Sequence, residues 1–361
     1  MTVAAIDEVA QLQEAVRAAR RILPVAGATK PALCTPPADD VVALDVSGLR
    51  GIVEYDPAEL TLTALAGTPV AQVAAALATH GQYLPFDPPL SGAGATLGGV
   101  VAAGTSGPNA FRHGGVRDFV IGVQIVDGEG RLVSGGGRVV KNAAGFDLSK
   151  LVVGSLGRLG VLTRISFKVF PRPAATTTVA FDAPSLTAAL ELVDRLARGP
   201  VALDALDLVG GVRVLARIGG PAEGLGRRAA RVAAESPDAA EMLVDDADLA
   251  AWREATDLEW IDDDERAVRV ALTARDVPAL AAALGARGAR ARYSLGGNLA
   301  WVAWPAREPI AALDRALTDL RLAGVVLTGP PDATLLGERR GGELARRIRA
   351  AIDPHRRFVE G

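Results

Sequence analysis

The sequence is short of the residues that most often carry thiol or metal chemistry. Its 361 residues include one cysteine, Cys34, and three histidines, His80, His113 and His355. One cysteine excludes an internal disulfide framework and any iron–sulfur cluster held by cysteines of this chain alone. The histidine spacing matches no ligand set, and the acidic run at 262–265 has no other ligand type near it. No metal site is therefore predicted.

The sequence also lacks an excess of basic charge and a long apolar run. Its formal net charge is −3 and its pI is near 5.8, so composition gives no basic footprint for nucleic acid or an anionic membrane surface. No apolar run approaches membrane-spanning length, and residues 1–8 do not resemble a signal peptide. These features predict a soluble chain, and the single cysteine fits a reducing cytoplasm. The length and the 49% hydrophobic content suggest two domains, each with its own core.

What is abundant is glycine, and one glycine-rich stretch follows Asp147. Asp147 is a good N-cap for a short helix, and Gly154, Gly157 and Gly160 then precede a strand predicted over 161–170. The alternation of apolar and polar residues in that strand is typical of a sheet buried on one face. The glycines fit either a ligand approached by backbone N–H groups or a tight connection between helix and strand.

Two other segments are rich in glycine and other small residues. A strand predicted over 22–25 runs into Ala26-Gly27-Ala28-Thr29-Lys30, whose N–H groups could form an anion-binding nest or an ordinary turn. Residues 92–99 contain several glycines but do not fit a Rossmann fingerprint, because Leu97 stands at the third glycine position and proline precedes the motif.

These segments together resemble a known superfamily. Residues 141–163 are similar to the pattern K-N-x-A-G-x-D-L-x-x-L-x-V-G-S-x-G-x-L-G-V-L-T. Residues 89–99 are similar to P-x-x-x-x-x-A-T-x-G-G, and residues 113–123 to a segment containing G-x-V-R-D-x-V-x-G. They resemble the vanillyl-alcohol oxidase flavoproteins, which have a PCMH-type FAD-binding domain. Within that superfamily the chain is most similar to the FAD-binding E subunits of bacterial glycolate oxidases.

The resemblance implies an α+β fold with FAD as a non-covalent cofactor. Non-covalent attachment is expected because the loop at 26–30 has neither histidine nor cysteine, and Cys34 lies in a proline-flanked stretch. The positions that match the family's cofactor motifs are Ala26, Gly27, Ala28, Thr29, Lys30, Pro88, Thr96, Gly98, Gly99, Gly104, Ser106, Gly107, Arg117, Asp118, Lys141, Asn142, Gly157, Gly160 and Val161.

Prolines at 171 and 173 predict the end of the first domain. The expected division is 1–171 for a PCMH-type FAD-binding domain of two α+β subdomains and 172–330 for a ferredoxin-like α+β cap. Residues 331–361 are expected to return to the FAD domain, with a basic amphipathic helix at 342–352 followed by a D-P-x-x-x-F ending. Strands predicted at 41–46, 51–55 and 60–66 are expected to form one small sheet.

The implied function is that of the FAD-binding subunit of a glycolate (2-hydroxy acid) oxidase complex. Such an oxidoreductase acts in glycolate catabolism, with a homologous flavin subunit and an iron–sulfur subunit carrying out electron transfer. The chain would then be cytoplasmic or associated with a membrane through the complex. The alternatives are a free-standing FAD oxidoreductase and a flavin-free scaffold. No catalytic residue is assigned, since Arg269, Arg292 and Tyr293 are candidates by type only.

Overall fold

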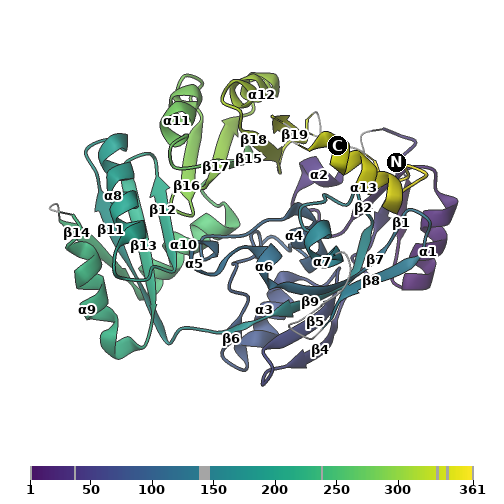
Figure 1. The fold of residues 1–361 in the computed structure, drawn as a ribbon, viewed down its shortest axis with the longest axis horizontal. Coiled ribbons are helices and arrows are strands. Elements are labelled where there is room, and N and C mark those ends of the chain that lie inside the picture. Colours follow the sequence, from purple (N-terminus) through teal and green to yellow (C-terminus); the bar gives the residue numbers. More distant parts are fainter. Residues whose placement is uncertain are drawn as a thin grey trace. The chain divides into compact units, whose positions relative to one another are not determined.

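The described part of the chain divides into two compact units. The computed structural model describes residues 2–35, 38–137, 147–236, 239–330, 333–338 and 341–359. Unit 1 comprises Met1–Ser106, Gly114–Arg172 and Arg340–Gly361, and unit 2 comprises Gly107–His113 and Pro173–Arg339 (Figure 1). No helix in these described ranges is both long enough and apolar enough to span a bilayer.

Unit 1 begins with a three-stranded parallel sheet. Strands β1 (Thr2–Ala5), β3 (Val42–Asp45) and β2 (Ile22–Val25) lie in the order β1-β3-β2. Helix α1 (Val9–Ala18) connects β1 to β2 and buries Leu12 and Val16, as its apolar spacing predicts. The short helix α2 (Pro31–Cys34) follows β2.

A five-stranded antiparallel sheet forms the second layer of unit 1. Its order is β4 (Ile52–Asp56), β5 (Thr61–Leu65), β9 (Val161–Lys168), β7 (Val120–Val126) and β8 (Leu132–Gly136). The two-residue strands β6 (Gln82–Tyr83) and β10 (Phe170–Pro171) pair separately. The other helices described in the first half of the chain are α3 (Val70–Ala78), α4 (Leu97–Ala103), α5 (Ala110–His113), α6 (Val116–Phe119) and α7 (Leu148–Val152). Of these, α5 belongs to unit 2.

The predicted grouping of the strands at 41–46, 51–55 and 60–66 into one sheet is wrong. The first of them, β3, pairs with β1 and β2, whereas β4 and β5 join the five-stranded sheet. Its apolar run has Val41, Ala43, Leu44 and Val46 all buried. Such a run suits the central strand of a parallel sheet that is covered on both faces.

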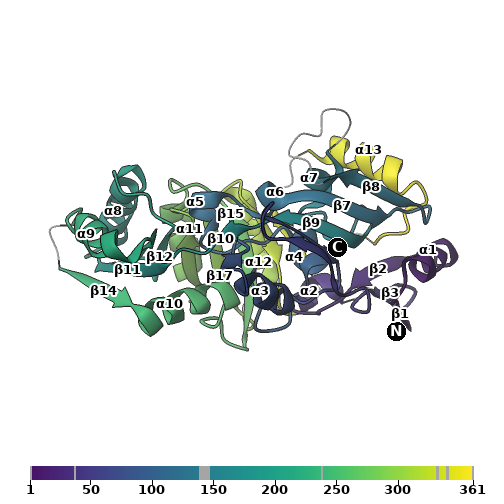
Figure 2. The ribbon, with the colours of Figure 1, turned by 90° about the horizontal axis from the view of Figure 1, so that it is seen from below.

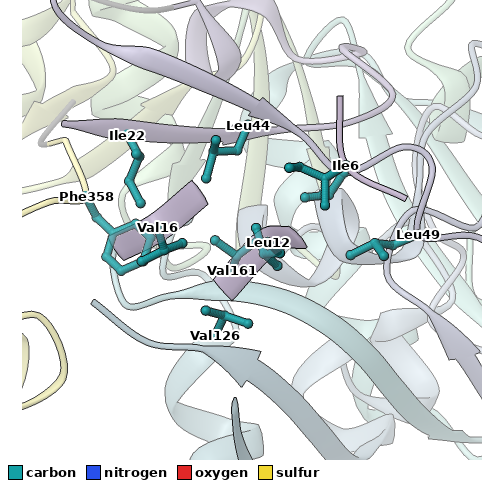
Figure 3. Packing of buried hydrophobic residues seen from close by; sticks show 10 residues of the cluster. Ile6, Leu12, Val16, Ile22, Leu44, Leu49, Val126, Val161 and Phe358 are labelled. Carbon is teal, nitrogen blue, oxygen red and sulfur yellow. The ribbon is translucent and has the colours of Figure 1, made fainter. Parts of the chain in front are cut away.

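The C-terminal residues of the described chain complete the first core. After α13 (Gly342–Ile352), the backbone of Phe358 bridges to Ile22 in parallel, with Ile22 N donating to Arg357 O at 2.8 Å and Val359 N to Ile22 O at 3.1 Å. The Phe358 ring is fully buried beside Val16 and Ile22 (Figure 3). The segment therefore extends the edge of β2.

A buried carboxylate fixes the turn before Phe358. Asp353 is fully buried, and its two carboxylate oxygens accept hydrogen bonds from the backbone N–H groups of Arg357 (2.9 Å) and Phe358 (3.0 Å). Both donors are thereby satisfied inside the protein, as buried backbone groups require.

Unit 2 is built from two β-α-β-β-α-β repeats. The first is β11 (Ala175–Asp182), α8 (Leu186–Arg198), β12 (Ala205–Val209), β13 (Arg213–Gly220), α9 (Ala222–Ala233) and β14 (Ala240–Val244). The second is β15 (Glu265–Ala271), α11 (Val277–Gly285), β16 (Arg290–Ser294), β17 (Leu299–Pro305), α12 (Ile310–Asp319) and β18 (Ala323–Val326). Their strand orders, β14-β11-β13-β12 and β18-β15-β17-β16, are equivalent. This is the ferredoxin-like pattern, present twice.

Strands β12 and β16 join the two repeats into one nine-stranded antiparallel sheet, with β19 (Leu335–Gly337) at its far edge. A buried ion pair crosses the junction: Arg292 Nε of β16 donates to Asp207 Oδ2 of β12 at 2.7 Å. Ser294 Oγ donates to the same oxygen at 2.9 Å. Removing one member of such a pair would leave a buried charge unpaired.

Helix α10 (Asp245–Asp257) covers one face of the first repeat (Figure 2). Its Trp252 packs on Ala180, Ala205 and Leu215. Its buried Asp248 accepts hydrogen bonds from Thr176, Thr178 and Arg217. Strand alternation places the neighbouring buried residues, such as Val214, on the opposite face, where α8 and α9 pack.

We expect Phe358→Ala to destabilise unit 1 by about 3–5 kcal/mol, because it removes a fully buried aromatic ring. All four tryptophans, Trp252, Trp260, Trp301 and Trp304, lie in unit 2. Urea unfolding followed by far-ultraviolet circular dichroism reports the whole chain, and tryptophan fluorescence reports unit 2. The control is Leu344→Ala, at a position 62% exposed in the same segment. Equal dichroism transitions for the two variants would contradict this account of the core.

Candidate functional site

Unit 1 contains a pocket that is lined mainly by the loops and helices connecting its strands. Its empty space, including the solvent at its mouth, is about 750 Å³. The lining comes from the end of β2 and the loop after it, from α2, α4, and the start of β9. The residues are Pro24, Val25, Ala26, Gly27, Ala28, Thr29, Lys30, Leu33, Cys34, Val46, Ala66, Thr96, Gly98, Gly99, Ala102, Ala103, Leu156, Gly157, Gly160, Val161 and Leu162.

The loop after β2 presents a row of backbone donors to this pocket. Within the described ranges, the N–H groups of residues 26–29 donate to no backbone or side-chain acceptor. Ala28 is held at φ +50°, a left-handed conformation that is costly for a residue with a Cβ. Lys30 follows at 6% exposure and also lines the pocket. Successive donors beside a lysine form an anion-binding concavity.

The first turn of α4 forms another wall, and its two glycines differ. Gly98 N donates to Ala66 O at 2.7 Å, and a Cβ on Gly98 would lie 2.9 Å from that oxygen. Its backbone N–H is therefore already bonded. A Cβ on Gly99 would meet only Thr96 Oγ1, at 3.2 Å, and would otherwise project into open space. Gly99 therefore leaves the pocket side of α4 bare, as close approach of a flat ligand requires.

The segment before β9 closes the pocket from another side. Asp147 caps α7 as predicted, accepting from Lys150 N at 3.1 Å. Gly157 has φ +75° and Gly160 has φ +136°. A Cβ on Gly160 would lie 2.9 Å from Val126 O, whereas one on Gly157 would be 3.5 Å from the Pro24 ring. The sequence left two interpretations open, a tight connection between helix and strand or a backbone that approaches a ligand. Gly157 and Gly160 fit both, because they lie in a tight connection and also line the pocket.

Comparison with known proteins places the same residues in a family. Residues 2–136 match the model of a family described as "FAD binding domain". The chain is 54% identical over 136 residues to glycolate oxidase subunit GlcE of Escherichia coli, covering 38% of this chain and 39% of that protein. It is 31% identical over 176 residues to glycolate oxidase subunit GlcD of Bacillus subtilis, covering 48% and 37%. Each of these alignments thus spans less than two-fifths of the relative's length.

The family match and the similarity to subunit GlcE support FAD as the cofactor of residues 2–136. A solved structure of alkyldihydroxyacetonephosphate synthase shares the fold over 98% of this chain and 74% of its own, with a TM-score of 0.73 and 17% identity. The predicted α+β fold class is thereby confirmed.

The pocket fits FAD on two structural grounds. The unpaired N–H groups of residues 26–29 and the buried Lys30 suit a diphosphate, and the bare surface at Gly99 leaves room for a planar or ribose group. Every lining residue from 24 to 103 lies within the FAD-binding domain. Ala26, Gly27, Ala28, Thr29, Lys30, Thr96, Gly98, Gly99, Gly157, Gly160 and Val161 are the sequence-predicted residues that the structure brings together here.

Other predicted cofactor residues have different contacts. Pro88 is buried and does not line the pocket, and Gly104 is the left-handed C-cap of α4. Ser106 Oγ accepts from Val116 N at 2.8 Å. Asp118 accepts from Gly115 N at 2.9 Å, and Arg117 donates to Lys150 O at 3.0 Å, so these two side chains shape α6 and its contact with α7.

Three further predicted residues cannot be placed at this pocket. Gly107 belongs to the short segment grouped with unit 2. Lys141 and Asn142 lie outside the described residues.

Sequence reasoning missed part of the lining. Ala102 and Ala103 lie three and four residues after Gly99 on α4, so helical spacing from Gly99 could have indicated them. Leu33 and Cys34 lie on α2, directly after the donor loop. Their residue types do not identify them in the sequence as lining residues, because they contribute only apolar surface to the pocket.

Cys34 is partly buried in this wall. Its Sγ donates to Lys30 O at 3.2 Å, and burial raises the pKa of the thiol, opposed by the charge of Lys30. At neutral pH the thiol is therefore protonated and weakly nucleophilic.

None of the three residues of unit 2 considered as a catalytic base by type is suited to that role. Arg292 is in the buried ion pair with Asp207. Burial raises the pKa of Tyr293 to about 12, so its phenol stays protonated at neutral pH. Arg269 is partly buried, and desolvation lowers its pKa. In the part of the chain that the structure describes, no cluster of three His, Cys, Asp or Glu side chains could hold a metal ion.

We expect Gly99→Val to weaken FAD binding about 5- to 150-fold, as overpacking of about 1–3 kcal/mol implies. Flavin absorbance per polypeptide and titration of the flavin-stripped protein would measure the loss, with circular dichroism confirming the fold. Gly98→Val is the matched comparison and should instead disrupt folding, because its Cβ meets the backbone of Ala66. Wild-type flavin content in Gly99→Val would show that α4 does not approach the cofactor.

Alkylation of the single cysteine gives a second measure of pocket occupancy. In flavin-free protein, the rate of Cys34 modification by iodoacetamide should rise about tenfold per pH unit above neutrality, because the raised pKa keeps the thiolate scarce. Added FAD should slow the reaction at every pH. Mass spectrometry of untreated protein should show Cys34 without a flavin adduct. Equal rates with and without FAD would place the cofactor away from α2.

Proposed function

We propose that this chain is the FAD-binding subunit of a complex that oxidises glycolate or a related 2-hydroxy acid. The observation that carries the proposal is the row of unpaired N–H donors and the buried Lys30 at the pocket. Both lie within a domain that is similar to subunits of two glycolate oxidases. The implied class is an oxidoreductase acting in glycolate catabolism.

The residues of unit 1 would bind and orient the cofactor. The N–H groups of 26–29 and Lys30 would hold the diphosphate, and Gly99, Ala102 and Ala103 would give α4 a smooth surface against it. FAD, when bound, supplies the two-electron redox chemistry. The apolar wall, which includes Leu33, Val46 and Leu162, would limit water around the bound group. Unit 1 would then be the FAD-binding domain and unit 2 the cap.

The chain is similar to two different glycolate oxidase subunits, GlcE and GlcD, and this similarity suggests a partner for it. GlcD of Bacillus subtilis is itself named as a glycolate oxidase subunit, so a partner homologous to this chain is a reasonable member of the complex. With one cysteine, this chain supplies no iron–sulfur cluster, which a separate subunit would have to provide for onward electron transfer. We propose that the complex is cytoplasmic or associated with a membrane.

The partner requirement predicts a measurable difference in turnover. The purified chain should carry FAD yet oxidise glycolate and D-lactate poorly with an artificial dye as electron acceptor. Addition of the homologous flavin subunit and the iron–sulfur subunit should raise the rate by at least about tenfold, since no base has been found among Arg269, Arg292 and Tyr293.

Gly99→Val in the reconstituted complex is the matched control, because it tests whether this chain's own flavin is needed. Turnover by the lone chain equal to that of the complex would favour a free-standing oxidoreductase. Full turnover by a complex containing a flavin-free variant of this chain would instead favour a scaffold.

A further inference from the structure

The donor loop, defined as residues 26–29, has no hydrogen-bonded support of its own. In the described ranges its N–H groups donate to no protein acceptor, and its carbonyl groups accept no hydrogen bond. Ordering such a segment when a ligand binds would cost conformational entropy and so weaken the binding. Packing against a neighbouring segment is therefore what can hold the loop in place.

Gly27 of the donor loop packs directly against the backbone of a second loop. A Cβ on Gly27 would lie 2.4 Å from Gly94 O and 3.2 Å from Thr96 Cγ2, and the first distance is too short for any real Cβ. Gly27 does not have a positive φ angle, so its own conformation does not require glycine. The close approach of the Gly94 carbonyl does require it.

The turn that carries Gly94, residues 90–94, is tied to the core of unit 1 at both ends. Before the turn, Phe86 is fully buried in a cluster of aromatic rings. After it, Ala95 is buried, its N–H group donates to Leu90 O at 3.1 Å, and its carbonyl accepts from Val70 N at 2.8 Å. The turn is thus a supported segment, in contrast to the donor loop.

The backbone in and before the turn is strained. Leu90 has φ +62° and Asp87 has φ +44°, which are left-handed conformations that residues with a Cβ rarely adopt. Gly94 has φ +93°, and a Cβ on it would meet no atom within 4 Å. Strained residues of this kind persist only where the surrounding structure fixes them. The position of the Gly94 carbonyl is therefore set by tertiary structure.

We propose that residues 90–94 are a positioning element of the cofactor site. The Gly94 carbonyl, packed on Gly27, holds the donor loop in its anion-binding conformation before the diphosphate arrives. This inference rests on the proposed function, because it takes the donor loop to bind the diphosphate of FAD. None of residues 90–94 lines the pocket, so the turn acts through Gly27 and not by touching the cofactor.

Gly94→Ala tests this role. Its Cβ would contact nothing, so the substitution acts only through the left-handed φ angle, which disfavours alanine and allows the turn to relax away from Gly27. We expect the flavin-stripped, full-length variant to bind FAD about 5- to 30-fold more weakly than the wild type in a fluorescence titration. Circular dichroism should show an unchanged fold.

Gly81→Ala is the matched control. Gly81 also belongs to unit 1, has φ +62° and open space around a Cβ, and does not line the pocket. Both variants should be destabilised in urea unfolding, because alanine is strained at either position. Gly81→Ala should nevertheless bind FAD like the wild type, whereas Gly94→Ala should not.

A double-mutant cycle tests the contact itself. Gly27→Ala places a Cβ against Gly94 O and should also weaken FAD binding. If both substitutions act by separating Gly27 from Gly94, the double variant should bind FAD about as weakly as the weaker single variant. Losses that multiply would overturn the proposal, because the methyl group at position 27 would then act on the cofactor directly.

The outcomes separate this inference from the proposed function. Equal FAD affinities of Gly94→Ala and Gly81→Ala would overturn the positioning role and leave the proposed function intact. A wild-type chain that does not bind FAD, or that binds it without protecting the amides of residues 26–29 from hydrogen exchange, would contradict both.

Discussion

The arrangement of unit 1 depends on how strand β2 is held on both sides. On one side β2 pairs with β3, and on the other Ile22 exchanges backbone hydrogen bonds with Arg357 and Val359, more than 330 residues later in the chain. Phe358 fills the core beneath, and Asp353 fixes the turn that delivers it. The loop that leaves β2 at Ala26 therefore follows a strand that is held by β3 on one side and by residues 357–359 on the other. A row of donors is useful to an anion only if its geometry is fixed before the anion arrives, because ordering it on binding would cost conformational entropy.

Local patterns predicted much of the fold, since most elements of both units follow apolar periodicity and turn residues. The predicted strand grouping was wrong because the sheet that a strand joins depends on residues far away in the sequence. β3 is separated from β1 by α1, and the residues around β3 do not indicate which strands pair with it. The relation between the two repeats of unit 2 is seen in their equivalent strand orders, which meet at β12 and β16. The C-terminal bridge to Ile22 likewise joins residues too distant for periodicity to connect.

The sequence motifs predicted which segments form the site, but they did not predict which atoms each residue contacts. Gly98 and Gly99 are neighbours in the same motif, yet Gly98 is required by the backbone of Ala66 and Gly99 faces the pocket. Only the positions of surrounding atoms separate these roles. Arg117 and Asp118 belong to another motif, and their hydrogen bonds stabilise α6 and the α6–α7 contact. Cys34 and Leu33 line the pocket through apolar surface, for which a sequence motif gives no sign.

The central claim is that the N–H groups of residues 26–29 bind the diphosphate of FAD. Hydrogen–deuterium exchange of the flavin-stripped chain, followed by mass spectrometry with and without FAD, tests it most directly. These N–H groups have no acceptor among the described residues, so they should exchange rapidly in the stripped protein and become protected when FAD is added. Strand β4, none of whose residues lines the pocket, should exchange equally in both states. FAD binding that leaves exchange at residues 26–29 unchanged would contradict the account.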